Sequence, residues 1–138
     1  MIYLVYGDND FLKRQAVAEI SRGQVASRYD GEMMDEAQLR DVLFGVSLFD
    51  ADNIVLITRI SENSVLWPKL PDIFTTETDK TIVFIEQKLD KRTKTYKWLA
   101  KNAKSKEFLQ FTDYQRSGLI NWLITRAKEV GVSLSLTQ

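Results

Sequence analysis

Short apolar runs alternate with amphipathic segments along this chain. The runs are rich in β-branched and aromatic residues and predict strands over residues 2–6, 24–29, 54–57, 81–85 and 107–111. Apolar residues at helical spacing predict helices over residues 10–20, 35–44, 93–103 and 113–130, and a helix interrupted by two prolines over 64–74. Strands that alternate with helices are parallel and joined by right-handed crossovers. The sequence therefore predicts a three-layer α/β domain with a parallel sheet of about five strands.

Length and composition fit a single domain. The chain has 138 residues, of which 44% are hydrophobic, and this suffices to bury one core. We therefore expect one domain over residues 1–138. No run of about 18 apolar residues is present, and the start MIYLVYGDND lacks the basic residues and the cleavage site of a signal peptide. We expect a cytoplasmic protein without membrane contact.

Cysteine and histidine are both absent. Without them no disulfide framework can form, and the common zinc ligand sets and the usual catalytic triads and dyads are excluded. Most hydrolase chemistry is thereby removed, and we expect neither a metal ion nor a cofactor. Basic and acidic residues number 19 each, so any attraction to nucleic acid depends on local clustering of charge.

The turn after the first predicted strand occupies the place where an α/β nucleotidase keeps its phosphate loop. That loop has the pattern G-x-x-x-x-G-K-[ST], in which glycines let backbone N–H groups point at phosphate. The stretch here is GDNDFLKR, which begins at Gly7 but has no glycine at the sixth position. Its two aspartates would repel a triphosphate. The third strand also leads to Arg59, where a magnesium-holding acid is expected. The pattern argues against ATP hydrolysis.

An alternative hypothesis is a magnesium-dependent nucleotidase or nuclease. Four acids follow predicted strands and could gather at one edge of the sheet: Asp8, Asp10, Glu86 and Asp90. The simpler interpretation is that Asp10 caps a helix, that Asp90 precedes one, and that the other two are solvated loop acids. We favour the simpler interpretation because acids without histidine or a repeated D-x-D pattern are a weak signal.

Eight basic residues and a single acid lie between residues 88 and 106. Lys91, Arg92, Lys94 and Lys97 are the candidates for contact with DNA phosphates, which would give modest, salt-sensitive binding. A helix with a solvated basic face has the same pattern. DNA binding is therefore one of two interpretations, and the solvated face is the other.

Two large apolar residues, Leu48 and Phe49, stand side by side in the heptapeptide FGVSLFD. The preceding helix is expected to stop near Gly45. Ser47 and Asp50 then form an S-x-x-D capping pattern that would start a short new helix. An adjacent pair on a tight turn can hardly face one core, which favours an anchor for a pocket on another protein. The alternative is that one of them packs under the sheet edge.

Six short motifs follow one another along the chain. They are LVYGDNDFL at 4–12, SLF at 47–49, IVLI at 54–57, IVFIEQKLDKRTK at 82–94, LINWL at 119–123 and GVSLS at 131–135. In this order and spacing they resemble the N-terminal domain of the delta subunit of bacterial DNA polymerase III, over essentially the whole chain. The resemblance implies a clamp-loader ATPase-like domain, with a P-loop NTPase-like fold that lacks a functional phosphate loop, and a non-catalytic role.

The resemblance also implies a function in DNA replication. In that family the delta subunit binds the ring-shaped beta sliding clamp and opens it, or holds it open. Primer-template DNA is therefore an indirect partner, onto which the opened ring is loaded. A Leu-Phe pair enters a hydrophobic pocket on the clamp, helped by an apolar residue two positions earlier; these positions are Leu48, Phe49 and Val46 here. Helical spacing also fits Val46 to the core, and both roles stay open. Delta subunits continue into further domains that contact the other clamp-loader subunits. Since this sequence ends at Gln138, we expect it to be the isolated first domain of a longer chain, which keeps clamp binding but not assembly with the other subunits.

Overall fold

Five parallel strands form one sheet. The computed structural model describes residues 1–45 and 54–110. The strands lie in the order β2-β3-β4-β1-β5, and each neighbouring pair is parallel. Their bounds are β1 (Ile2–Tyr6), β2 (Ala26–Asp30), β3 (Ile54–Thr58), β4 (Thr81–Ile85) and β5 (Lys104–Glu107). The predicted α/β class with a parallel sheet is confirmed.

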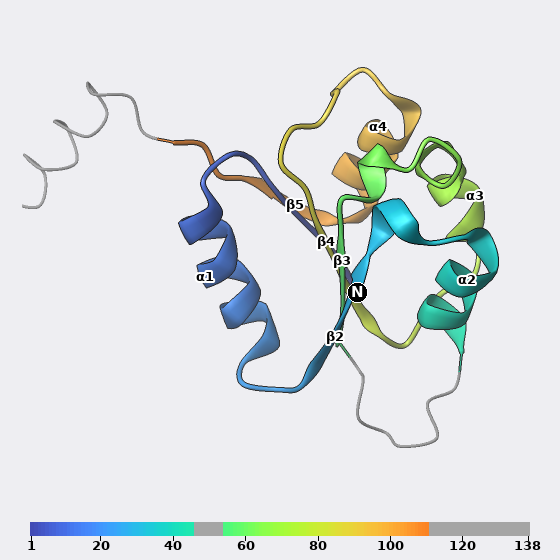
Figure 1. Cartoon of the computed structure of the whole chain (residues 1–138), viewed down its shortest axis with the longest axis horizontal. Coiled ribbons are helices and arrows are strands. Elements are labelled where there is room, and N and C mark those ends of the chain that lie inside the picture. Colours follow the sequence, from blue (N-terminus) through green and yellow to red (C-terminus); the bar gives the residue numbers. More distant parts are fainter. Residues whose placement is uncertain (46–53, 111–138) are drawn as a thin grey trace, which may run out of the picture.

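Helices cover both faces of this sheet, as Figure 1 shows. On one face lies α1 (Asp10–Ser21), and on the other lie α2 (Glu36–Phe44), α3 (Leu70–Ile73) and α4 (Lys94–Asn102). Three short 3-10 helices complete the described elements: η1 (Gly31–Met33), η2 (Ile60–Glu62) and η3 (Trp67–Lys69). The three-layer arrangement is therefore as the sequence predicts.

Strand residues point alternately to the two faces and divide the core into two clusters. Leu4 and Phe84 belong to the larger cluster, which packs against α2, α3 and α4. Val5 and Val83 belong to the smaller cluster, which packs against α1 through Ala16, Val17 and Ile20. Because α1 is the one described helix on its face, pockets remain on both sides of it.

Side chains cap the three longer helices at their starts. Asn9 caps α1, Asp35 caps α2 and Thr93 caps α4 by accepting hydrogen bonds from backbone N–H groups. The expectation that Asp10 caps α1 is wrong. Asp10 is the first helical residue, and its carboxylate pairs with Lys13 at 3.2 Å. Asparagine and aspartate cap helices about equally well, so the sequence Asp-Asn-Asp does not by itself select the cap.

The fifth strand begins three residues earlier than predicted and ends four residues earlier. The sequence predicts a strand over 107–111, whereas β5 spans Lys104–Glu107. All four of its residues are exposed, so no apolar pattern marks it. It is an edge strand that is defined by pairing with β1, for example Val5 opposite Lys106. Local patterns detect buried strands better than an edge strand of this kind.

The helix before the apolar pair ends as predicted. Its last residue is Phe44, and Gly45 follows with φ −66, outside the left-handed region. The proline-containing segment is broken into η3 and α3, which is also the prediction. The predicted helix over 93–103 is α4, on which Leu99 is buried and Ala100 is exposed. The predicted helix over 113–130 lies outside the described residues.

Candidate functional site at the carboxyl end of the sheet

Three backbone N–H groups in and after the loop that follows β1 are bound within the chain. The N–H of Gly7 donates to the carbonyl oxygen of Gln87 at 2.8 Å, and the N–H of Asn9 donates to that of Phe108 at 3.0 Å. A third N–H, in the first turn of α1, donates to Asn9 Oδ1 at 3.1 Å. A phosphate loop needs such groups to point at the nucleotide. Here they bind neighbouring segments of the chain.

Gly7 is required for this close packing. Its φ is 120, a conformation that L residues with a side chain rarely adopt. A Cβ added at this position would lie 2.0 Å from the carbonyl oxygen of Phe108. The one glycine retained from the phosphate-loop pattern thus serves the contact between this loop and the segment after β5.

Lys13 stands at the position of the phosphate-loop lysine, but its ammonium group is bound within the chain. The residue is 5% exposed. Its Nζ donates to the carbonyl oxygen of Glu86 at 3.0 Å and lies 3.2 Å from Asp10 Oδ1. The ammonium group, which a nucleotidase directs at phosphate, is therefore bound by the carbonyl of Glu86 and the carboxylate of Asp10. The contact joins α1 to the end of β4 and stabilises the fold.

Replacing Lys13 with methionine is expected to lower the free energy of unfolding by about 1–3 kcal/mol. Methionine fills a similar volume but leaves the buried carbonyl of Glu86 without its donor. Urea denaturation followed by circular dichroism measures the change. Lys101→Met, at an exposed site on α4, is the matched control and should have little effect. Equal losses in both variants would contradict this role for Lys13.

The interpretation of Glu86 as a solvated loop acid is wrong, because the residue is a buried carboxyl group directly after β4. It is 2% exposed, and its two oxygens accept hydrogen bonds from the backbone N–H and the hydroxyl of Ser61, at 2.7 and 3.2 Å. Burial raises the pKa of Glu86 to about 7, although the hydrogen bonds from Ser61 act in the opposite direction. The carboxyl group therefore titrates near neutral pH and links β4 to η2.

The four acids of the magnesium hypothesis do not converge. Each bonds a different partner: Asp8 to Gln110, Asp10 to Lys13, Glu86 to Ser61 and Asp90 to Arg92. Within the two described ranges, no group of three or more acids is arranged to hold a metal ion. The structure therefore offers the nucleotidase or nuclease alternative no set of ligands in this part of the chain.

The residue after β3 is Arg59, as the sequence indicates, and it lies in an acidic surrounding. Its guanidinium group pairs with Asp30 at 2.5 Å and with Glu32 at 2.9 Å. These contacts raise the pKa of Arg59, chiefly through the hydrogen bond to Asp30. Arg59 thus links the ends of β2 and β3 at the position where a nucleotidase holds magnesium with an acid.

The candidate DNA-contacting residues lie around the start of α4. Lys91 and Arg92 each pair with an acid, at 3.1 and 3.0 Å. Lys94 and Lys97 are exposed on α4. Half of the candidates thus have a local countercharge, and contact with DNA stays a prediction.

The predicted clamp-binding and capping residues lie outside the described residues: Val46, Ser47, Leu48, Phe49 and Asp50. The structure does describe the elements that flank them. α2 ends at Phe44 and β3 begins at Ile54. Phe44 packs edge-on against Phe74, with ring centroids 6.3 Å apart. The preceding helix is thereby anchored in the larger core cluster.

Comparison with known proteins bears on the fold. No protein-family model matches the sequence, and no curated protein matches it in sequence. The five-stranded parallel sheet with helices on both faces is consistent with a clamp-loader-like α/β fold. A solved structure that matches it is the DNA clamp loader delta protein YqeN of Bacillus subtilis, with a TM-score of 0.65 and 17% sequence identity. The match covers 97% of this chain and 44% of that protein, so the chain spans less than half of its length.

Among residues 1–45 and 54–110, none of the helices is long and apolar enough to cross a bilayer.

Sequence reasoning missed two features of this end of the sheet. One is the contact between Lys13 and Glu86, which are 73 positions apart. The only local signal was that Lys13 is the seventh residue of the stretch that begins at Gly7, the position of the lysine in the phosphate-loop pattern. The other is a pocket beside α1, to which α1 contributes Arg14 and β2 contributes Arg28. No spacing rule connects a helix residue to a residue on an edge strand.

Proposed function

We propose that this chain is the clamp-binding domain of a delta-type clamp-loader subunit. It binds the beta sliding clamp and helps to open the ring for loading on primed DNA. The observation that carries the proposal is the shared fold, since a solved clamp loader delta protein matches 97% of the chain with a TM-score of 0.65. The loop after β1 supports the same role, because the N–H groups of Gly7 and Asn9 are bound within the chain. A subunit that acts by binding another protein needs no phosphate site.

The proposed binding segment joins α2 to β3. It consists of an apolar trio and two capping neighbours: Val46, Leu48 and Phe49, with Ser47 and Asp50. The segment leads into the amino end of β3, whereas the loop after β1 follows the carboxyl end of a parallel strand. We therefore propose that the clamp approaches the amino ends of the strands, whereas the degenerate phosphate loop lies at their carboxyl ends.

The proposed mechanism is differential binding. A domain that binds the opened ring more tightly than the closed ring shifts the equilibrium toward opening by no more than that difference in affinity. No ATP is consumed by this domain. The chain spans 44% of the matched delta protein. For this reason we propose contacts with other clamp-loader subunits and with primer-template DNA only for an assembled clamp loader.

Hydrogen exchange of the whole chain, with and without the beta sliding clamp of the same organism, tests this proposal. We expect the clamp to slow amide exchange in peptides that contain residues 46–50, because a buried anchor excludes water. Peptides from α4 serve as the internal control and should exchange unchanged. Protection confined to the region of Lys91 to Lys97, or no protection at all, would contradict the proposed binding segment.

A further inference from the structure

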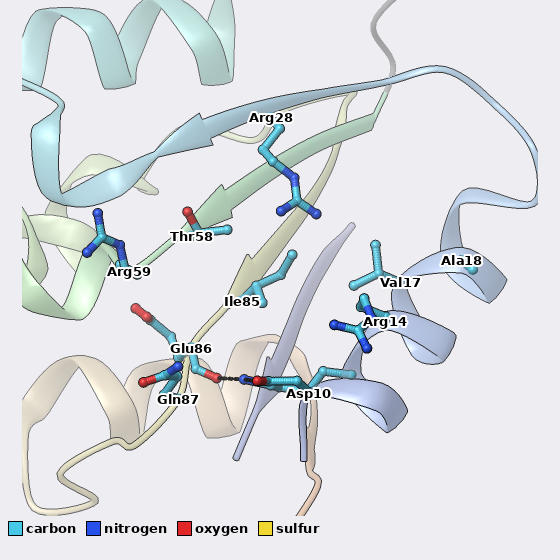
Figure 2. A pocket seen from close by; sticks show the side chains of 11 residues that line it. Asp10, Arg14, Val17, Ala18, Arg28, Thr58, Arg59, Ile85, Glu86 and Gln87 are labelled. Carbon is cyan, nitrogen blue, oxygen red and sulfur yellow. Dashed lines mark hydrogen bonds and ion pairs between the residues drawn. The ribbon is translucent and has the colours of Figure 1, made fainter. Parts of the chain in front are cut away.

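A pocket of about 540 Å³ lies beside α1 at the carboxyl ends of β3 and β4. Figure 2 shows it between α1 and the neighbouring strands, on the face of the sheet opposite α2, α3 and α4. Pockets of about 300–1,000 Å³ commonly hold small molecules. Neither the clamp-binding proposal nor the fold comparison assigns this pocket a ligand.

The floor and one wall of the pocket are apolar. Val17 and Ala18 line it from α1, and Ile85 lines it from the end of β4. Thr58, at the end of β3, donates its hydroxyl hydrogen to the carbonyl oxygen of Tyr29 and so does not offer that hydrogen to a ligand. This part of the pocket suits an aliphatic or aromatic group.

Two arginines lie on opposite sides of this floor. Arg14 comes from α1 and Arg28 from β2, and Figure 2 shows their guanidinium groups directed toward the space between these elements. Among the described residues, neither has a carboxylate within ion-pair distance. A guanidinium group binds carboxylate or phosphate oxygens through two parallel hydrogen bonds.

The remaining charged groups of the pocket are already engaged. Lys13 pairs with Asp10 at 3.2 Å, and Arg59 pairs with Asp30 at the end of β2 and with Glu32 in η1. The oxygens of Glu86 accept hydrogen bonds from Ser61. The uncompensated charge is therefore positive and comes from Arg14 and Arg28.

We infer that this pocket binds a small organic anion, with a phosphate or carboxylate group held by Arg14 and Arg28 and an apolar body over Val17 and Ile85. A nucleoside triphosphate does not fit this assignment, since the N–H groups of Gly7 and Asn9 and the ammonium group of Lys13 are occupied. The pocket lies at the carboxyl ends of β3 and β4, whereas the proposed clamp-binding segment precedes the amino end of β3 in the chain.

Titration of the 15N-labelled, full 138-residue chain with phenyl phosphate, followed by amide chemical shifts, tests this inference. We expect saturable shifts at Arg14, Val17, Arg28 and Ile85. Inorganic phosphate should bind at least about tenfold more weakly, because it lacks the apolar body. Phenol, which lacks the charge, should not saturate. Benzoate is the second anion, and its affinity relative to phenyl phosphate decides between carboxylate and phosphate ligands.

The double variant Arg14→Gln with Arg28→Gln should weaken phenyl phosphate binding by at least about tenfold, since both charge-assisted contacts are lost. Both arginines are exposed, so the variant is expected to fold, which the dispersion of its amide signals checks. Arg40→Gln, on α2 at the other face of the sheet, is the matched control and should bind as the parent does. Failure of phenyl phosphate to saturate, or equal affinity in the double variant, would overturn the inference.

Discussion

Replacing Leu48 and Phe49 together with alanine is expected to lower the affinity for the sliding clamp by about 100-fold or more. Burial of a leucine or phenylalanine side chain contributes about 1.5–3 kcal/mol, so that the pair accounts for about 3–6 kcal/mol. Each 1.4 kcal/mol corresponds to a tenfold change in Kd, which sets about 100-fold as the lower bound. Surface plasmon resonance on the immobilised clamp measures the loss.

The same double variant should keep the stability of the parent chain, because the proposed anchor contacts another protein rather than the core. Phe11→Ala combined with Met33→Ala is the matched control, since both side chains are large, apolar and exposed at 59% and 77%. The control variant should bind the clamp as the parent does. If the Leu48 and Phe49 variant unfolds, or if both variants lose affinity equally, the assignment of the pair is wrong.

The second large effect concerns Glu86 and pH. The pKa of this group is about 7 in the folded protein, and its ordinary value is 4.5. Between these two values the folded state holds a proton that the unfolded state has released, so stability falls as pH rises. One pKa unit corresponds to 1.36 kcal/mol, and the loss from Glu86 between pH 4.5 and 7 is therefore about 3 kcal/mol.

Glu86→Gln should remove this loss. Glutamine has the shape of the protonated carboxyl group and can still accept from the backbone N–H of Ser61. The stability difference between parent and variant, from urea denaturation at several pH values, isolates Glu86 from the other carboxyl groups. Relative to the parent, the variant should gain stability from pH 4.5 to 7 and stay level above. Glu19→Gln, at an exposed site on α1, is the control. A difference that does not change over this window would contradict the buried, raised-pKa state.

The buried strands could be predicted from the sequence because a strand that is covered on both faces requires a continuous run of apolar residues. The apolar run over 81–85 is β4, and its central residue Val83 packs under α1 while Phe84 faces the other core cluster. An exposed edge strand has no such constraint. β5 is held by backbone hydrogen bonds to β1, and these depend on tertiary position rather than on local residue types.

The candidate site could be predicted only in part. The missing glycine at the sixth position of the loop indicated that no triphosphate binds there, and the hydrogen bonds of Gly7 and Asn9 agree with this. The sequence could not reveal that Lys13 is bound by Glu86, since the contact requires α1 and β4 to lie together. The pocket with Arg14 and Arg28 likewise forms only because α1 and β2 lie close together in the fold. Such sites depend on packing between distant segments.

The affinity of this chain for the beta sliding clamp of its own organism bears most directly on the proposed function. Isothermal titration calorimetry of the whole chain into the clamp, without nucleotide, measures it. The proposed function predicts saturable binding without ATP, because the domain acts through an apolar anchor rather than through a phosphate site. Absence of binding to the clamp, or binding that appears only with ATP and magnesium, would contradict the proposal.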